Sequence, residues 1–325
     1  MATLTNIQAI TDALKIAMRR DDRVVVLGED VGKLGGVFRA TQGLQKEFGV
    51  ERVIDTPLAE AGIVGTAVGM AIFGMRPVAE IQFDGFLLPA LNQLIAHAAR
   101  MRNRTRSRFH VPLVVRVPWG GGIHAPEHHS DSIEAILAHT PGLKIVMPST
   151  PYDMKGLLLA AIEDPDPVLF LEHKRIYRAV KGEVPEDFYT IPIGKAQVIR
   201  EGTDVTLIGW GFTRHLCVRV AEQFVPHSVS AEVIDLRTIT PWDEETVLAS
   251  VTKTGRIVIV QEAARQCGLG AEIAAVVAER TMFSLKGPIE RVTGYDITMP
   301  LPKAEKLNIP DERRVMAAVE RVMQY

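Results

Sequence analysis

Short apolar runs and longer amphipathic segments alternate along the whole chain. Runs rich in β-branched residues predict buried strands, and apolar positions with a period near 3.6 predict helices. In the first half, the predicted strands are residues 23–28, 51–55, 77–83, 112–117, 143–148 and 167–172. The predicted helices are an N-terminal one capped by Thr5, followed by residues 60–73, 86–101 and 151–163. This alternation predicts an α/β fold with a parallel sheet.

The pattern loosens between about residues 174 and 204, which we interpret as a linker with a hairpin. A second α/β series follows. Its predicted strands are residues 204–210, 230–236, 255–262 and 288–294, and its predicted helices are residues 212–224, 243–252, 268–281 and 311–323. The sequence therefore predicts two α/β domains, residues 1–190 and residues 191–325.

Composition narrows the class of protein. A chain of 325 residues with a formal net charge of -2 gives no reason to expect a nucleic acid or an anionic membrane as partner. Two cysteines, Cys217 and Cys267, are too few for a disulfide framework and fit a reducing compartment. The longest uncharged run follows Glu60 and is too short to span a bilayer. We expect a cytoplasmic protein.

Glu60 stands at the head of a predicted helix that is otherwise apolar, in the stretch DTPLAEAGIVGTAVGMAIFG. A buried carboxylate without a partner is costly. The same helix carries Gly62, Gly65 and Gly69, although each interior glycine costs roughly 1 kcal/mol against alanine. These glycines indicate close approach of a neighbouring helix or of a bound ligand. Glu60 is either a first-turn carboxylate favoured by the helix dipole or a functional group held against a partner.

The segment GGGIHAPEHHSDS, residues 120–132, concentrates three histidines on a predicted loop. This composition indicates a metal site or a proton-transfer site, and a solvated loop is the alternative. Because the adjacent side chains of His128 and His129 rarely face one centre, at least one of them is expected to be a bystander.

Two further stretches carry candidate residues. Phe83 and Phe86 flank a strand-to-helix turn, a place that lines the ligand crevice of a parallel sheet. The arginine-rich run at residues 100–108 is more typical of a subunit interface or a solvated turn than of nucleic acid contact. The chain lacks a P-loop, a GxGxxG fingerprint, a GxSxG elbow and a Gly-Asp-Gly diphosphate signature.

Seven segments together resemble one known family, in order and over essentially the whole chain. They are LGEDVGKLGGVF, DTPLAEAGIVGTAVGMA, EIQFDGF, HHSDS, PSTPYDMKGLLLAAIEDPDPVLFLEHKRIYR, AEVIDLRTITPWD and KTGRIVIVQEA. They resemble the beta subunit of the thiamine diphosphate-dependent 2-oxo acid dehydrogenases, the decarboxylating component of the pyruvate and branched-chain 2-oxo acid dehydrogenase complexes. The resemblance implies a pyrimidine-binding domain and a transketolase-like C-terminal domain. It also implies an alpha2beta2 heterotetramer, whose alpha subunit holds the diphosphate and Mg2+, and a lipoyl acyltransferase core as a further partner.

The resemblance assigns roles to single residues. Glu60 is expected to hydrogen-bond the aminopyrimidine nitrogen of thiamine diphosphate and to favour the imino tautomer that removes the thiazolium proton. His129 is expected to assist acyl transfer to the lipoyl group, and Phe83 to face the substrate side chain. The other residues expected to line the cofactor pocket are Glu29, Leu58, Ala59, Gln82 and Phe86. A potassium ion is expected at Val111, Leu113, Val114, Ala161, Asp164 and Asp166.

Several alternatives remain at this point. The substrate is expected to be a branched-chain 2-oxo acid, with pyruvate as the second candidate. An acetoin dehydrogenase beta subunit is the nearest rival. A metal-dependent hydrolase built on His124, Glu127, His129 and Asp131 is a rival of another class, and a non-catalytic scaffold subunit is the third.

Overall fold

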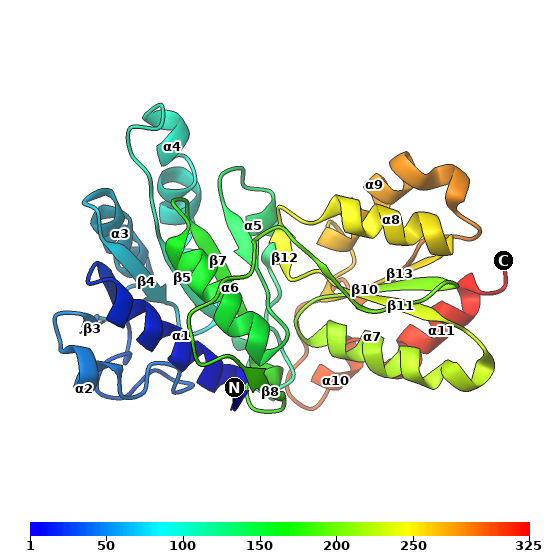
Figure 1. Cartoon of the computed structure of the whole chain (residues 1–325), viewed down its shortest axis with the longest axis horizontal. Helices are drawn as coiled ribbons and strands as arrows, with labels where there is room; N and C mark the ends of the chain where they lie inside the picture. The colour runs from blue at the N-terminus through cyan, green and yellow to red at the C-terminus, as the bar shows by residue number, and fades with distance from the viewer.

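The computed structural model describes residues 1–325 and consists of two α/β units that lie side by side (Figure 1). Each unit is built on a mostly parallel sheet with helices on both faces. The first unit contains a sheet of seven strands in the order β12-β6-β7-β5-β4-β2-β3. Its strands are β2 (Val24–Gly28), β3 (Val53–Asp55), β4 (Arg76–Glu80), β5 (Val114–Trp119), β6 (Lys144–Val146), β7 (Val168–His173) and β12 (Thr238–Thr240).

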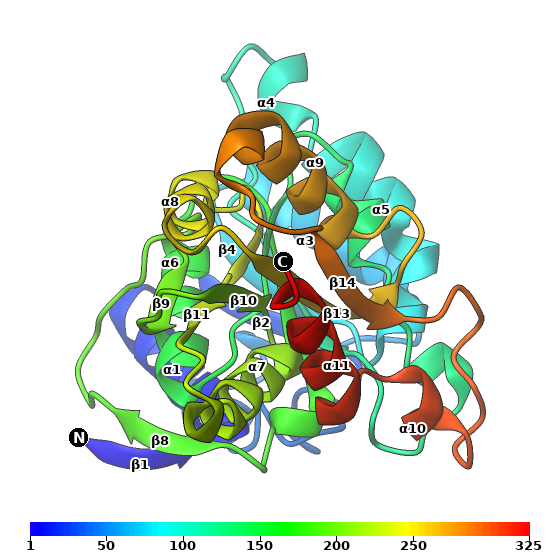
Figure 2. The ribbon, with the colours of Figure 1, turned by 90° about the vertical axis from the view of Figure 1, so that its right-hand side faces the viewer.

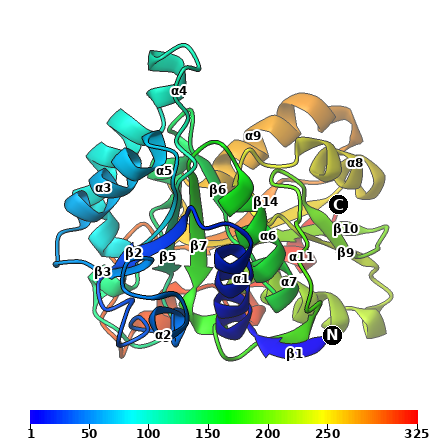
Figure 3. The ribbon, with the colours of Figure 1, turned by 60° about the vertical axis from the view of Figure 1, so that its left-hand side comes forward.

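Alternate residues of these strands point to opposite faces, as the period of two requires. Val24 and Val26 of β2 pack with helices α1 and α6, whereas Leu27 packs with α3 on the other face. Figure 3 shows α1 and α3 on either side of the sheet. The bounds of these helices are α1 (Asn6–Arg20), α3 (Glu60–Ile72) and α6 (Pro151–Glu163). Thr5 caps α1 through a capping box with Gln8, which confirms the cap predicted from the sequence.

The second unit has five strands in the order β14-β13-β10-β11-β9. Figure 2 shows its sheet between two pairs of helices, α8 and α9 on one face and α7 and α11 on the other. The strands are β9 (Gln197–Arg200), β10 (Val205–Gly209), β11 (Ala231–Asp235), β13 (Ile257–Ala264) and β14 (Glu290–Gly294). The helices are α7 (Phe212–Gln223), α8 (Glu244–Thr254), α9 (Leu269–Thr281), α10 (Glu305–Asn308) and α11 (Glu312–Val322).

The remaining elements are short. They are β1 (Ala2–Thr5), α2 (Leu44–Phe48), the 3-10 helix η1 (Asp84–Ala90), the π-helical turn η2 (Gln93–Ala98), α4 (Met101–Arg104), η3 (Glu127–His129), α5 (Glu134–Ala138), η4 (Lys174–Ile176), β8 (Lys181–Val184), η5 (Val225–His227) and η6 (Met282–Ser284). No helix combines the length and the apolar character that crossing a bilayer requires.

Two predictions about elements were wrong. The linker contains no hairpin, because β8 pairs antiparallel with β1 and β9 pairs antiparallel with β11. The single helix predicted at residues 86–101 is broken into η1, η2 and α4. Pro89 lies inside η1 and cannot donate the backbone hydrogen bond that a continuous α-helix needs.

A third feature was missed. β12 follows the second unit's strand β11 in the chain, yet it pairs antiparallel with β6 of the first sheet. One apolar cluster of 36 buried residues accordingly extends from the first sheet into the second, and includes Ile145, Ile208 and Ile239.

Candidate active site

The candidate residues meet at the carboxyl edge of the first sheet. Glu29 directly follows β2, Glu60 begins α3 just after β3, and Gln82 and Phe83 follow β4. In open parallel sheets, ligands bind outside the carboxyl ends of the strands. The topology thus brings together residues that lie more than fifty positions apart in the chain.

Two carboxylates approach each other at this edge. Glu29 and Glu60 are each 8% exposed. Burial first, and then the like charges of Glu60 and Asp30, raise the pKa of Glu29. The Oε1 atom of Glu29 is buried without a hydrogen-bond partner in the chain. Because buried polar atoms are almost always satisfied, this oxygen has the character of a ligand-binding group.

Aromatic and imidazole rings form the neighbouring wall. The ring of His129 stacks on Phe83 with centroids 3.9 Å apart and meets Phe86 edge-on at 4.9 Å. Burial lowers the pKa of His129, so its imidazole is neutral at pH 7, and its Nδ1 atom is buried without a partner. A neutral imidazole in this state can accept or donate one proton at a bound ligand.

The histidine loop lies directly on the turn that carries the two phenylalanines. A Cβ atom on Gly85 would come within 2.2 Å of the carbonyl oxygen of His128, so only glycine allows this approach. His128 is exposed, and its Nδ1 lies 3.5 Å from a carboxylate oxygen of Glu127. Of the two adjacent histidines, His129 is therefore the one enclosed by aromatic rings.

A buried ion pair, which the sequence analysis missed, lies beside the turn that carries Phe83 and Phe86. Lys174 Nζ lies 2.5 Å from Asp84 Oδ2, and both side chains are fully buried. Burial raises the pKa of Asp84 to about 7, against the opposing effect of Lys174. Lys174 Nζ also lies 5.7 Å from the ring centroid of Phe83. The available signal was a lysine at the carboxyl end of a predicted strand, in the segment LEHKR.

A second buried network crosses the sheet behind the site. Arg116 Nη1 lies 2.6 Å from Glu80, and Arg116 Nε lies 2.6 Å from Glu172. The hydroxyl of Tyr177 donates to Glu172 at 2.5 Å. Because the network joins β4, β5 and β7, it fixes the strand ends from which the site residues project.

The other predicted pocket residues lie at an open rim. Leu58 is 78% exposed and Ala59 is exposed, whereas Phe86 is half-buried. Gln82 donates from Nε2 to Asp30 at 3.4 Å. The site is therefore walled on the side of η1 and η3 and open on the side of α3.

The residues expected to hold potassium gather at the start of β5 and the end of α6. Their side-chain carboxylates are already paired: Lys144 Nζ lies 2.7 Å from Asp164, and Arg102 Nε lies 2.6 Å from Asp166. The carbonyl of Leu113 accepts the N–H of Val168 within the sheet. A potassium ion here would rely on main-chain oxygens that retain a free lone pair, so the site stays a prediction.

The hydrolase hypothesis was wrong about its metal site. No group of three or more His, Cys, Asp or Glu side chains has the arrangement needed to hold a metal ion. His124 Nδ1 instead lies 3.2 Å from the carbonyl of Pro302, away from His129. The arginine-rich run also lies outside the site, since α4 projects from the edge of the molecule (Figure 1).

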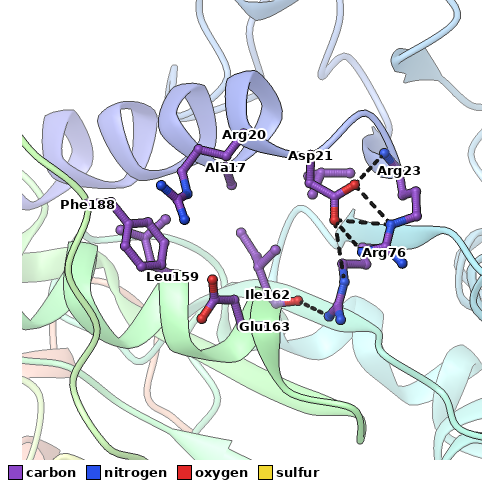
Figure 4. A pocket seen from close by; sticks show the side chains of 10 residues that line it. Ala17, Arg20, Asp21, Arg23, Arg76, Leu159, Ile162, Glu163 and Phe188 are labelled. Atoms are coloured by element: carbon purple, nitrogen blue, oxygen red, sulfur yellow. Dashed lines mark hydrogen bonds and ion pairs between the residues drawn. The ribbon is translucent and has the colours of Figure 1, made fainter.

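A cavity of about 560 Å³ lies at the opposite edge of the sheet, where the strands begin (Figure 4). Arg20 stacks over Phe188 at 4.0 Å, and Arg76 Nη1 donates to the carbonyl of Ile162 at 2.6 Å. Val24 and Arg76 are the first residues of their strands. This cavity is thus separated from the candidate active site by the length of the strands.

Comparisons with known proteins agree with this arrangement. Residues 2–180 match the family described as "Transketolase, pyrimidine binding domain", and residues 194–315 match "Transketolase, C-terminal domain". The chain is 53% identical over 322 residues to "Pyruvate dehydrogenase E1 component subunit beta" of Acholeplasma laidlawii, covering 99% of this chain and 98% of the relative. It is 50% identical to the protein of the same name and to "2-oxoisovalerate dehydrogenase subunit beta", both from Bacillus subtilis and both matched over 100% of either chain. A solved structure titled "Split gene transketolase, inactive beta4 tetramer" superposes with a TM-score of 0.81 at 22% identity, covering 99% of this chain and 98% of that one, which shows the fold.

Proposed function

Since the chain belongs to the beta subunits of the thiamine diphosphate-dependent 2-oxo acid dehydrogenases, we propose that it supplies half of an active site. With an alpha subunit, it decarboxylates a 2-oxo acid and passes the acyl group to a lipoyl disulfide. The observation that carries this proposal is the placement of two buried, interacting carboxylates, one with an orphaned oxygen, at the same sheet edge as Phe83, Phe86 and His129.

The residues of this edge fit the aminopyrimidine end of thiamine diphosphate. That ring offers a basic nitrogen, an amino group and an aromatic face. A carboxylate at Glu60 can hold a proton at the ring nitrogen. Burial and the charge of Glu60 raise the pKa of Glu29, which places a second carboxyl group nearby. Phe86 offers an aromatic face, and Leu58, Ala59 and Gln82 complete the rim. When bound, thiamine diphosphate supplies the nucleophilic carbon and the electron sink for decarboxylation.

His129 and Phe83 are suited to the second half of the reaction. The stacked Phe83 ring fixes the imidazole plane, and the lowered pKa keeps His129 neutral and able to exchange a proton. We assign His129 to proton transfer at the lipoyl sulfur and Phe83 to the wall against the substrate side chain.

The alpha subunit is expected to cover the open side of the site. One face of α3 carries Gly62, which is exposed, and Gly65 and Gly69, which are partly exposed. A Cβ on Gly69 would meet no atom of this chain within 4 Å, whereas one on Gly65 would contact Gln93. Glycines on an exposed helix face permit close packing of a second helix. This feature supports an alpha2beta2 assembly, in which the alpha subunit would hold the diphosphate and Mg2+ and the lipoyl acyltransferase core would join the complex.

The test is dye-linked 2-oxo acid decarboxylation with thiamine diphosphate and Mg2+. The chain would be assayed alone and with its co-expressed alpha partner, on branched-chain 2-oxo acids and on pyruvate. We expect activity in the pair only. We propose a preference for branched-chain 2-oxo acids, with pyruvate as the second substrate. Both are assayed because relatives named for each substrate are about equally similar to the chain.

Inactivity of a well-formed pair on every 2-oxo acid would contradict the proposal. Cleavage of acetoin by that pair would then identify the nearest rival, and inactivity on acetoin as well would indicate the scaffold subunit. Equal activity of the isolated chain and of the pair would contradict the proposal that this chain supplies only half of the active site.

A further inference from the structure

A glycine-rich loop connects β5 to the short helix that carries His129. Its backbone occupies the left-handed region at Gly120, Gly122 and His124, with φ of 75°, 90° and 61°. Such a path is unfavourable for His124, which has a Cβ, and needs support from its surroundings. At the C-terminal end of this loop, the N–H of His129 donates to the carbonyl of Pro126 at 2.9 Å. The position of η3, and with it that of His129, therefore depends on the path of the loop.

The support comes from the second unit of the molecule. The N–H of Gly121 donates to Glu262 Oε1 at 2.6 Å, and the N–H of Gly122 donates to Glu305 Oε1 at 2.6 Å. The N–H of His124 donates to the other oxygen of Glu305 at 3.1 Å. Two carboxylates thus accept hydrogen bonds from three of the four backbone N–H groups between Gly121 and His124.

These carboxylates are buried and have no other role in the proposed chemistry. Glu262 projects from β13 and is 6% exposed, and Glu305 begins α10 and is 0% exposed. His173 Nε2 lies 2.8 Å from the second oxygen of Glu262. Although burial opposes it, His173 together with the Gly121 N–H lowers the pKa of Glu262, so this group is a charged acceptor at pH 7. Charged acceptors make the stronger hydrogen bonds.

We propose that Glu262 and Glu305 are positioning residues, which hold the glycine loop from the second unit and thereby set the position of His129. The inference rests on the proposed function, because it concerns the acyl transfer that His129 assists. It gives the second unit a direct part in the site formed by the first.

The experiment uses the chain in complex with its alpha partner. Glu305→Ala removes both acceptors, and Glu305→Gln keeps one oxygen while turning an amide N–H toward a backbone donor. The matched control is Glu312→Ala, because Glu312 also belongs to the second unit but pairs with Arg219 on the surface. Each variant is assayed for dye-linked decarboxylation, for acyl transfer to a lipoyl domain and for melting temperature. His129→Ala and the double variant Glu305→Ala/His129→Ala complete a cycle.

If the carboxylate acts through His129, Glu305→Ala lowers acyl transfer about tenfold or more and changes dye-linked decarboxylation by less than about threefold. The loss for Glu305→Gln is smaller, and Glu312→Ala matches the wild type. The double variant is no slower than His129→Ala, because two changes that act on one group are not additive.

Unchanged acyl transfer in Glu305→Ala, or losses that multiply in the double variant, would overturn the inference. Equal losses in both assays would also overturn it, since they indicate general damage to the site. If Glu305→Ala does not assemble, the same criteria are applied to Glu305→Gln. An inactive wild-type pair would instead reject the proposed function, so the two failures are distinguishable.

Discussion

At the scale of single residues, the polar groups behind the site and those lining it differ in how they are satisfied. Arg116 is bonded on both sides by glutamates although it is fully buried. Glu29 Oε1 and His129 Nδ1 are equally enclosed but have no partner in the chain. A buried group without a partner costs about 1–3 kcal/mol, so the lining residues are complementary to a ligand rather than to each other.

Glu60→Gln tests the carboxylate at the head of α3. The substitution keeps the shape of the side chain but cannot hold or release a proton. We expect the melting temperature of the pair to stay near the wild-type value and dye-linked decarboxylation to fall about 100-fold or more. The exposed Glu163→Gln is the control, and near-normal turnover of Glu60→Gln would contradict its role.

His129→Ala tests the division between the two half-reactions. Removal of the imidazole should lower acyl transfer to a lipoyl domain by about 100-fold, and dye-linked decarboxylation by much less, because only the former needs a proton at sulfur. Comparison of the two rates on one preparation is the measurement. Equal losses in acyl transfer and in dye-linked decarboxylation would mean that His129 acts at an earlier step of the reaction.

Glu134 makes stability depend on pH. It is buried against Trp119, and burial raises its pKa to about 7 from an ordinary 4.5. Because the folded state binds this proton more tightly, the contribution of Glu134 is fully present below pH 4.5 and is lost as the pH rises through 7. Glu134→Gln should therefore gain stability relative to the wild type as the pH rises from 5 to 8, by up to roughly 3 kcal/mol.

Denaturant unfolding at both pH values measures this difference. The exposed Glu279→Gln serves as the control and should follow the wild type. If the free energy of unfolding of Glu134→Gln depends on pH in the same way as that of the wild type, ionisation of Glu134 costs the folded state little, which contradicts the prediction.

At the scale of elements, α3 combines a buried face with an exposed face of small residues. Ile63, Val64 and Ala67 pack against the sheet. The opposite face ends at Phe73, which is 92% exposed. An amphipathic surface helix would carry polar residues there, so this face indicates contact with another chain.

Gly69→Leu separates folding from assembly. The new side chain meets no atom of this chain within 4 Å of its Cβ. Loss of a helix-interior glycine removes a cost of about 1 kcal/mol, so the melting temperature of the isolated chain should stay the same or rise. Co-purification with the alpha partner should fall sharply, whereas Ala275→Leu on the exposed face of α9 should have no effect. Normal assembly of Gly69→Leu would exclude this face from the interface.

The elements show what the sequence could predict. Residues 151–163 form the predicted helix without change, and most strands begin and end within two or three residues of their predicted positions. Their signal is local, because each one has an apolar period and turn residues at its ends. The pairing of β8 with β1 has no such signal, since the two strands lie about 180 residues apart. β12 is only three residues long, too short for a detectable period.

The same limit applies to the site. Glu60 and the histidine loop were detectable as residue types that conflict with their surroundings or are unusually concentrated. The carboxylates Glu262 and Glu305 were not, because each appears as an ordinary charged residue until the fold brings it to its partner. For Lys174 the sequence shows only its place at the end of a predicted strand, and its partner Asp84 lies 90 residues away.

At the scale of the whole molecule, the two sheets do not form independent units. β12 extends the first sheet, and the buried cluster passes from Met147 to Ile208 without a break. Inter-domain contacts of this kind couple the unfolding of the two halves.

We therefore expect the isolated chain to melt in one calorimetric transition, with calorimetric and van't Hoff enthalpies that agree. A fragment of residues 1–190 lacks β12 and leaves the edge of β6 unpaired, so it should aggregate. Light scattering and calorimetry measure the two outcomes. Two resolved transitions, or a monomeric fragment of normal stability, would contradict the coupling.

The bare face of α3 has a consequence for how the protein is made. A newly synthesised chain that finds no partner presents glycine backbone and the Phe73 ring to water. Such a surplus copy would attract chaperones and proteases, whereas an assembled copy would hide these groups. The amount of this chain in the cell would then be limited by the output of its partner, and copies made in excess of that partner would be degraded faster than assembled ones.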